Sequence, residues 1–261
     1  MRNPIRRSSP TVSVVRLSGV IASGPRGLND QTVAPLLEKA FRKKPKAVAL
    51  VINSPGGSPV QSSLIGARIR RLAAEKDVPV LAFVEDVAAS GGYWIACAAD
   101  EIFVDESSII GSIGVISASF GFHELIDRYG IERRVHTAGE SKSFMDPFLP
   151  EKEEDVARLK TLQTQIHDSF IAHVRSRRGA KLDEAQGLFG GEIWVGSNAI
   201  APGIADAVGH LVPVMKERFG DKVRFQVFGQ RRSLLSRFGM SLTDGIATSL
   251  AHRGLWARFG L

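Results

Sequence analysis

The amino-acid sequence predicts an α/β fold made of βαβ units around a mostly parallel sheet. Short runs of apolar, β-branched residues recur along the chain, and amphipathic stretches of helical periodicity lie between them. Because most of these runs are apolar throughout, they are typical of strands buried on both faces, as parallel strands are. The composition, with 44% hydrophobic and 23% charged residues, is that of a globular protein.

Strands and helices alternate along most of the chain. The predicted strands are residues 12–17, 47–52, 78–84, 101–104 and 223–228. The predicted helices are residues 30–44, 59–76, 91–99, 121–129 and 151–178. The last helix begins with acidic residues and ends with Arg177 and Arg178, a distribution of charge that stabilises the helix dipole. Gly179 follows and ends this helix.

Three segments differ in charge and pattern. Residues 1–10 are a basic N-terminal arm, residues 11–228 form one predicted domain, and residues 229–261 are a basic, amphipathic C-terminal tail. We expect the tail to pack against a neighbouring subunit or the body of the chain, with membrane contact as the alternative. No nucleic-acid motif accompanies the basic ends, so no nucleic-acid partner is predicted.

The sequence predicts neither a cleavable signal peptide nor a transmembrane helix. Arg16 interrupts the apolar stretch that follows the basic N-terminus, and the longest uncharged runs are shorter than the ~20 residues of a spanning helix. We therefore expect a cytoplasmic or peripherally membrane-associated protein. Cys97 has no partner for a disulfide and is predicted to be a buried apolar residue rather than a nucleophile.

A first candidate motif is the glycine turn Asn53–Gly57, which follows a predicted buried strand. Pro59 can occupy the first turn of the next helix. Amide N–H groups at such a turn can stabilise an oxyanion, so Gly56 or Gly57 is a candidate donor. An ordinary strand-to-helix turn would have the same sequence.

A second motif places Ser90 between small residues, after another buried strand and before a helix. Small neighbours allow a peptide carbonyl to approach the hydroxyl, and the amide of Gly91 can join the oxyanion donors. A serine in this position is also typical of a helix N-cap.

A serine nucleophile needs a base, and Lys142 is the candidate. It lies between a turn of small residues and an apolar segment, where burial would favour the neutral amine that a general base requires. Alone, Lys142 would be interpreted as an exposed surface lysine. The histidines are isolated and are interpreted as surface or capping residues; they are His123, His136, His167, His173, His210 and His252.

These motifs together resemble the signal peptide peptidase A family, serine peptidase family S49, within the ClpP and crotonase superfamily. The matching segments are NSPGG, AASGGYWIA, GSIGVI and GESKSFMDPF, which stand in the family's order. Further on, RRG, WVGSNA and GIAD resemble the family's later signature, although its LVD is IAD in this chain. The resemblance covers about residues 11–210 and implies a ClpP/crotonase-like spiral of βαβ units.

The resemblance also implies the roles of individual residues. Ser90 would be the nucleophile and Lys142 its general base, 52 residues apart as in the family, and Ser112 would orient the lysine amine. The implied protein is an ATP-independent serine endopeptidase that cleaves signal-peptide remnants or other small unfolded or membrane-derived peptides. It would assemble into a homo-oligomeric ring and need no metal or cofactor. Residues implied to line the peptide are Ser58, Pro59 and Val60, together with Ile113, Gly114 and Val115 of an expected strand at residues 113–116.

Two alternatives belong to other classes of protein. A crotonase-type acyl-CoA hydratase or isomerase shares the fold and would need an acidic group near the glycine turns, for which Asp86 is the nearest candidate. That reading leaves Ser90, Ser112 and Lys142 without a role. A catalytically silent scaffold would be expected to have lost the serine or the lysine, and both are present.

Overall fold

The computed structural model describes residues 9–24, 27–139, 142–229 and 254–261. The predicted tail, residues 229–261, lies mostly outside the described residues, as does most of the N-terminal arm. The chain forms two compact units, one of Met1–Ile113 with Ile171–Leu261 and the other of Gly114–Phe170. We call them the sheet unit and the inserted unit.

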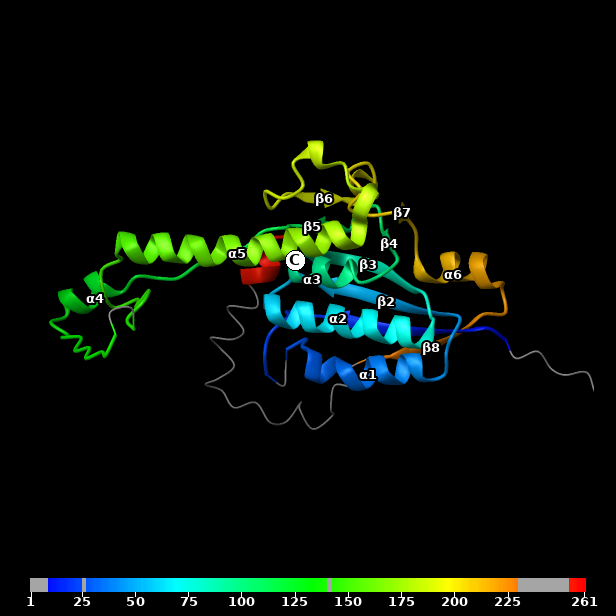
Figure 1. The fold of residues 1–261 in the computed structure, drawn as a ribbon, viewed down its shortest axis with the longest axis horizontal. Coiled ribbons are helices and arrows are strands. Elements are labelled where there is room, and N and C mark those ends of the chain that lie inside the picture. Colours follow the sequence, from blue (N-terminus) through cyan, green and yellow to red (C-terminus); the bar gives the residue numbers. More distant parts are fainter. Residues whose placement is uncertain (1–8, 25–26, 140–141, 230–253) are drawn as a thin grey trace, which may run out of the picture. The chain divides into compact units, whose positions relative to one another are not determined.

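The sheet unit contains a mostly parallel sheet in the order β6-β5-β3-β2-β1-β8, in which β4 pairs with β3 and β7 (Figure 1). The long strand β3 is shared, because its first half pairs with β4 and its second half with β5. Only the β5–β6 pair is antiparallel among the described strands. The strands are β1 (Thr11–Ser18), β2 (Ala47–Ser54), β3 (Val80–Ala89), β4 (Glu101–Val104), β5 (Ile109–Gly111), β6 (Ile193–Val195), β7 (Ala207–Val208) and β8 (Arg224–Phe228).

Helices cover both faces of this sheet. Ser13 of β1 donates a hydrogen bond to the carbonyl of Ala40 in α1, so its face of the sheet lies under α1, beside which α2 runs in Figure 1. The alternate residues Val12 and Val14 pack in a cluster with Met215 of α6 on the other face. The helices are α1 (Asp30–Arg42), α2 (Pro59–Lys76), α3 (Gly91–Ala96), α4 (His123–Arg128), α5 (Glu153–Arg178) and α6 (Leu211–Phe219), with short 3₁₀ turns at Gly179–Lys181, Glu184–Gln186 and Gly196–Ala199.

The strands and helices predicted from periodicity are all present, and α2 and β4 have the predicted bounds. Pro59 occupies the first turn of α2, as predicted. One prediction was wrong: residues 113–116 were expected to be a strand, whereas β5 ends at Gly111 and these residues have no regular structure. The sequence also gave no signal for β5, β6, β7 or α6.

The inserted unit consists of α4, the first part of α5 and the segments around them. It presents many apolar side chains to solvent, including Ile116, Phe120 and Tyr129, which are 66%, 79% and 72% exposed. Helix α5 has acidic residues in its first turn and basic residues in its last turn, as predicted. None of the described helices is both long and apolar enough to cross a membrane.

Candidate active site

Ser90 lies at a strained turn between β3 and α3. Its backbone has φ 51° and ψ −119°, a conformation that residues with a Cβ rarely adopt. The residue is in the N-cap position of α3, but its side chain makes no capping hydrogen bond. The interpretation of Ser90 as a simple N-cap therefore fails, because its hydroxyl does not perform that function.

The glycine turn lies directly against Ser90. A Cβ added to Gly56 would come within 2.8 Å of the Ser90 Cβ and 3.0 Å of the Gly91 nitrogen, so only glycine allows this approach. The turn is fixed on its other side by Ile21, whose N–H donates to the Gly56 carbonyl at 2.8 Å. Two motifs that are far apart in the sequence thus meet around one hydroxyl.

The two candidate oxyanion donors in the glycine turn differ in their hydrogen bonding. The Gly56 N–H donates to the Ser54 hydroxyl at 3.2 Å. Within the described parts of the chain, the N–H groups of Gly57 and Gly91 have no recorded acceptor. Among the described residues, Gly57 and Gly91 are therefore the candidate donors whose N–H groups have no protein acceptor.

Ser112 lies at the end of the neighbouring strand. Ala89 pairs with Gly111 in the parallel β3–β5 ladder, and the Ser90 N–H donates to the Gly111 carbonyl at 2.8 Å. Ser112 follows Gly111, has a φ of 53° and is buried. Ser90 and Ser112 thus follow directly paired residues at the same edge of the sheet.

The residues predicted to line the peptide differ in exposure. Val60, in the first turn of α2, is 64% exposed, and Leu64 follows one helical turn later with 46% exposed. Ile113 is fully buried, so its side chain is part of the core. Gly114 and Val115 belong to the inserted unit and are partly exposed.

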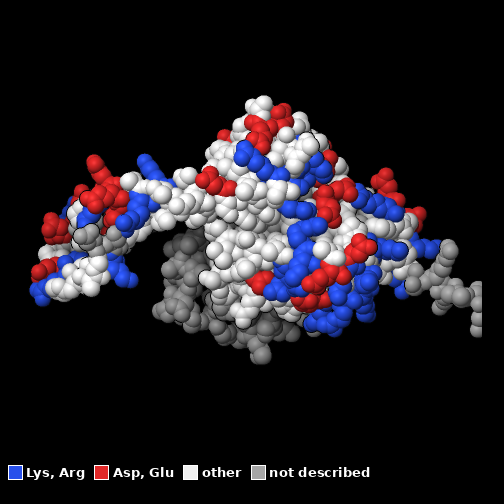
Figure 2. Space-filling view, in the orientation of Figure 1, with Lys and Arg blue, Asp and Glu red and all other residues white. Residues whose placement is uncertain are grey.

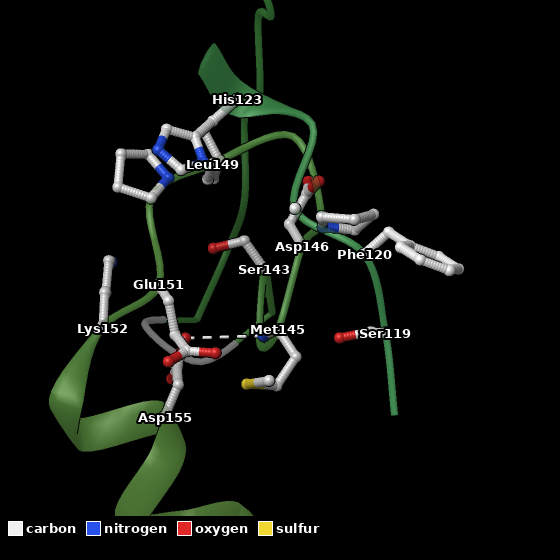
Figure 3. A pocket seen from close by; sticks show the side chains of 13 residues that line it. Ser119, Phe120, His123, Ser143, Met145, Asp146, Leu149, Glu151, Lys152 and Asp155 are labelled. Atoms are coloured by element: carbon white, nitrogen blue, oxygen red, sulfur yellow. Dashed lines mark hydrogen bonds between the residues drawn. The ribbon is translucent and has the colours of Figure 1, made fainter. Parts of the chain in front are cut away.

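Lys142 belongs to the inserted unit, and its side chain is exposed. The apolar segment that follows Lys142 in the sequence does not cover its side chain within this unit, and the pairing of Lys142 with Ser90 stays a prediction. The segment after it lines a cavity of about 140 Å³ with residues of the chain before α4 and at the start of α5 (Figure 3). Within this cavity the Met145 N–H points to the Asp155 carboxylate at 3.5 Å.

The segment after Lys142 is held in place by polar and aromatic contacts within the inserted unit. Asp146 accepts a hydrogen bond from Arg133 at 2.7 Å, and Phe148 stacks on Phe122. The Phe122 N–H donates to the Pro147 carbonyl at 2.6 Å. The charge of Arg133 lowers the pKa of Asp146 through this hydrogen bond.

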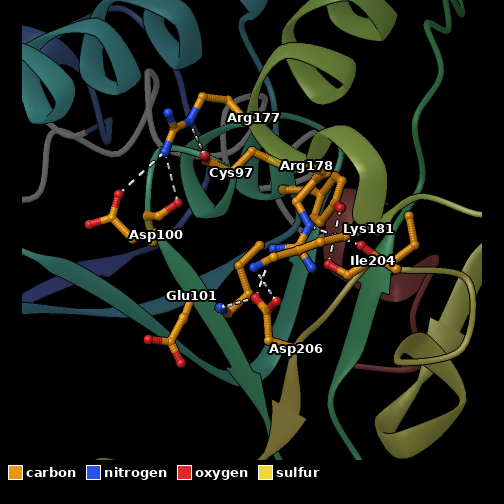
Figure 4. Close-up of polar contacts among 12 residues, drawn as sticks. Cys97, Asp100, Glu101, Arg177, Arg178, Lys181, Ile204 and Asp206 are labelled. Atoms are coloured by element: carbon orange, nitrogen blue, oxygen red, sulfur yellow. Dashed lines mark hydrogen bonds and ion pairs between the residues drawn. The ribbon is translucent and has the colours of Figure 1, made fainter.

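A buried ion pair connects α5 with the segment that ends in IAD (Figure 4). Arg178 donates to Asp206 at 2.7 Å and to the Gly203 carbonyl at 2.9 Å, and Lys181 donates to the other Asp206 oxygen at 2.6 Å. Asp206 also accepts from the Ile102 N–H in β4. Burial alone would raise the pKa of Asp206, but the hydrogen bonds from Arg178 and Lys181 outweigh it and lower the pKa.

The neighbouring residues of α3 are held by the same end of α5. Arg177 donates to the carbonyls of Cys97 and Ala99, and Tyr93 donates to the carbonyl of Ile204 (Figure 4). Cys97 is fully buried, as predicted, and burial raises its pKa to about 12. The RRG and IAD motifs therefore brace the helix that follows Ser90, a role that sequence reasoning missed although it singled out both motifs.

The histidines were interpreted as surface or capping residues, and His173 differs. Its ring stacks on Trp94 of α3 with centroids 4.4 Å apart, and its Nε2 lies 3.0 Å from the Trp94 carbonyl oxygen. Burial lowers the pKa of His173. His210 contacts Asp105 at 2.8 Å near the surface.

In the part of the chain that the structure describes, no group of three or more His, Cys, Asp or Glu residues could hold a metal ion.

The parallel sheet of βαβ units, with a serine at a strained strand-to-helix turn, defines a ClpP/crotonase-like fold with a candidate nucleophile. The sequence model of peptidase family S49 matches residues 73–219, more than half of the chain. The chain belongs to peptidase family S49.

Known proteins of several kinds are similar to this chain. A Brucella melitensis protein named Na+/H+ antiporter NhaA is 48% identical, over 96% of this chain and 37% of that protein. Protease 4 of Haemophilus influenzae is 32% identical, over 76% of this chain and 32% of that protein. The chloroplastic serine protease SPPA of Arabidopsis thaliana is 30% identical, over 76% of this chain and 29% of that protein. The chain thus spans about a third of the length of these relatives.

Solved structures share the fold at low sequence identity. A mutant of the 1510-N membrane-bound stomatin-specific protease, in complex with a substrate peptide, matches with a TM-score of 0.55 and 15% identity. The match covers 88% of this chain and 96% of that one. A second mutant of the same protease has a TM-score of 0.51.

Proposed function

We propose that the protein is a serine endopeptidase in which Ser90 is the nucleophile and Lys142 the general base. The carrying observation is the strained turn at Ser90, whose hydroxyl makes no capping bond and whose Cβ lies against the glycine turn at Gly56. Backbone strain of about 1–3 kcal/mol persists where the surrounding structure enforces it, and such strain is concentrated at functional sites. Membership of peptidase family S49 supports the reaction class.

The proposed reaction assigns a separate task to each residue. The Ser90 oxygen attacks the scissile carbonyl while Lys142 takes the hydroxyl proton, and the lysine then returns a proton to the leaving amine. The N–H groups of Gly57 and Gly91, which have no recorded acceptor among the described residues, would stabilise the oxyanion. Ser112 would orient the lysine amine, and water would then hydrolyse the acyl-enzyme.

We further propose that the substrate is a small, unfolded, apolar peptide, such as a signal-peptide remnant or a membrane-derived fragment, cleaved without ATP. Val60 and Leu64 form an exposed apolar strip on α2 beside Gly57, which favours apolar side chains in the substrate. We also propose a homo-oligomeric ring, because the inserted unit exposes apolar side chains such as Phe120. Light scattering would measure the assembly.

Cleavage of a quenched apolar peptide tests the proposed function. Ser90→Ala and Lys142→Ala should each abolish cleavage, whereas Lys152→Ala, which replaces an exposed lysine just before α5, should retain it. Full activity of Ser90→Ala would contradict the proposal. Turnover of an acyl-CoA that survives the first two substitutions but not Asp86→Asn would favour the crotonase-type alternative instead.

A further inference from the structure

A second cleft lies in the sheet unit, at the end of the sheet away from Ser90. It measures about 720 Å³, within the roughly 300–1,000 Å³ that is usual for ligand sites. Its walls are the residues before β2 and β3 and at the beginning of β1, whereas Ser90 follows the last residue of β3. Strand β3 separates the two sites by roughly 30 Å.

Lysines dominate the lining of this cleft. Lys43, Lys44, Lys46 and Lys76 line it, and Asp77 is the single acidic residue among the described residues of the lining. None of these lysines forms an ion pair with a residue that the structure describes. The nearby Arg68, Arg70 and Arg71, in contrast, are all paired with carboxylates. Figure 2 shows Lys and Arg gathered where α1 and α2 end. The other polar groups are mainly hydroxyls and an amide, from Ser9, Thr11, Ser13 and Gln226.

The lysines could simply complement the C-terminal ends of α1 and α2, whose cap residues Lys43 and Asp77 line the cleft. The negative charges at these helix ends do not balance the positive charges of the lysines. Each helix end contributes about half a negative charge, and Asp77 contributes one, against four lysines. About two positive charges remain uncompensated by this estimate.

We propose that this lysine cleft binds a compound that carries at least one phosphate group. One phosphate monoester brings about 1.5 to 2 negative charges, which matches the surplus of about two positive charges, and lysine binds phosphate as a point charge. The described residues of the lining include no aromatic side chain on which a base could stack, so a nucleic-acid strand fits less well. The phosphates can belong to a soluble polyanion or to a lipid headgroup.

Calorimetric titration with inorganic tripolyphosphate tests the proposal. The cleft variant combines Lys43→Gln, Lys44→Gln, Lys46→Gln and Lys76→Gln, and the control variant makes the same change of charge at the exposed Lys152, Lys160, Lys216 and Lys222. We expect the wild type and the control to bind at one site and the cleft variant to bind at least about tenfold more weakly, since a lysine near phosphates is worth about 1 kcal/mol. Absence of wild-type binding, or equal weakening in both variants, would overturn the proposal.

Two further measurements test where the phosphate binds and which compound carries it. Hydrogen exchange of the wild type should slow at residues 43–47 and 76–80 when tripolyphosphate is added, which requires no variant to fold; unchanged exchange there would count against the cleft. Phosphatidylcholine vesicles with and without phosphatidylinositol 4,5-bisphosphate identify the source of the phosphates. Binding that depends on the cleft lysines and occurs only with the vesicles that contain phosphatidylinositol 4,5-bisphosphate would assign a lipid headgroup. Binding of a polyglutamate peptide or duplex DNA in preference to both phosphate probes would refute the proposal.

Discussion

The N–H of Ser90 donates to the carbonyl oxygen of Gly111 at 2.8 Å, and Ser112 is the next residue in that chain segment. The proposed nucleophile is therefore held by the same strand that leads to the serine proposed to orient its base. Because both Ser90 and Ser112 have positive φ values, each backbone turns sharply where its strand ends. The arrangement makes the conformation of the turns, as well as the chemistry of the side chains, open to test.

Ser90→Gly should make the protein more stable than Ser90→Ala does. Glycine relieves the strain at φ 51°, whereas alanine retains it, so we expect a difference of about 1 kcal/mol in the free energy of unfolding. Urea denaturation followed by circular dichroism measures it, and both variants should be inactive. Equal stability of the two variants would show that the turn is unstrained.

Gly56→Ala should abolish activity and destabilise the sheet unit. The added methyl would meet the Ala89 carbonyl oxygen and the Ser90 Cβ at 2.8 Å, so the two turns would have to separate. Gly19→Ala is the matched control, because Gly19 has a similar φ of 109° but no atom within 4 Å of an added Cβ. If both variants lose the same activity and stability, backbone conformation alone explains the effect.

Removal of one partner of the Arg178–Asp206 pair should be costly. Arg178→Met removes the buried partner of Asp206, which keeps the more exposed Lys181, and we expect a loss of about 3 kcal/mol in stability. Arg175→Met provides the control, since Arg175 pairs with Glu184 at the surface, where a pair contributes about 0–1 kcal/mol. Thermal unfolding would measure both, and equal effects would be inconsistent with a bracing role for Arg178.

The folded protein should lose stability in acid because the Asp206 carboxylate becomes protonated. Because its pKa is lower in the folded protein than in the unfolded chain, its ionised form contributes stability above the unfolded pKa of about 3.9, and this is lost as pH falls through the folded value. The difference in stability between wild type and Asp206→Asn should therefore be largest at neutral pH and shrink below about pH 4. A difference that is independent of pH would exclude this linkage.

Cys97 should be inert in the folded protein. Burial raises its pKa to about 12, so at pH 8 iodoacetamide should label it only as fast as the protein unfolds. Mass spectrometry at increasing urea concentrations measures the labelling. Rapid labelling of the native protein would place the thiol in contact with solvent.

Periodicity in the sequence was sufficient where an element is strongly apolar, as β2 is, or long, as α2 is. It failed for β5, β6 and β7, because strands of two or three residues are determined by tertiary pairing and leave no pattern of their own. Helix α6 was missed because it is only nine residues long and lies between two short strands.

The motifs were sufficient to locate the candidate nucleophile but not its surroundings. The positive φ of Ser90 and Ser112 and the use of the Gly56 N–H by Ser54 depend on backbone geometry that residue types alone do not determine. The exposure of Lys142 was also unforeseen, because apolar neighbours in the sequence do not ensure that a side chain is covered. Pairing of Lys142 with Ser90 stays a prediction.

Peptide mapping after treatment with a fluorophosphonate tests the central claim most directly, because this reagent reacts with an activated serine hydroxyl. The account predicts a single adduct on Ser90 in the wild type and in Lys152→Ala, no adduct in Ser90→Ala, and strongly reduced labelling in Lys142→Ala. An adduct on another serine, or labelling that is equal in all four proteins, would contradict it.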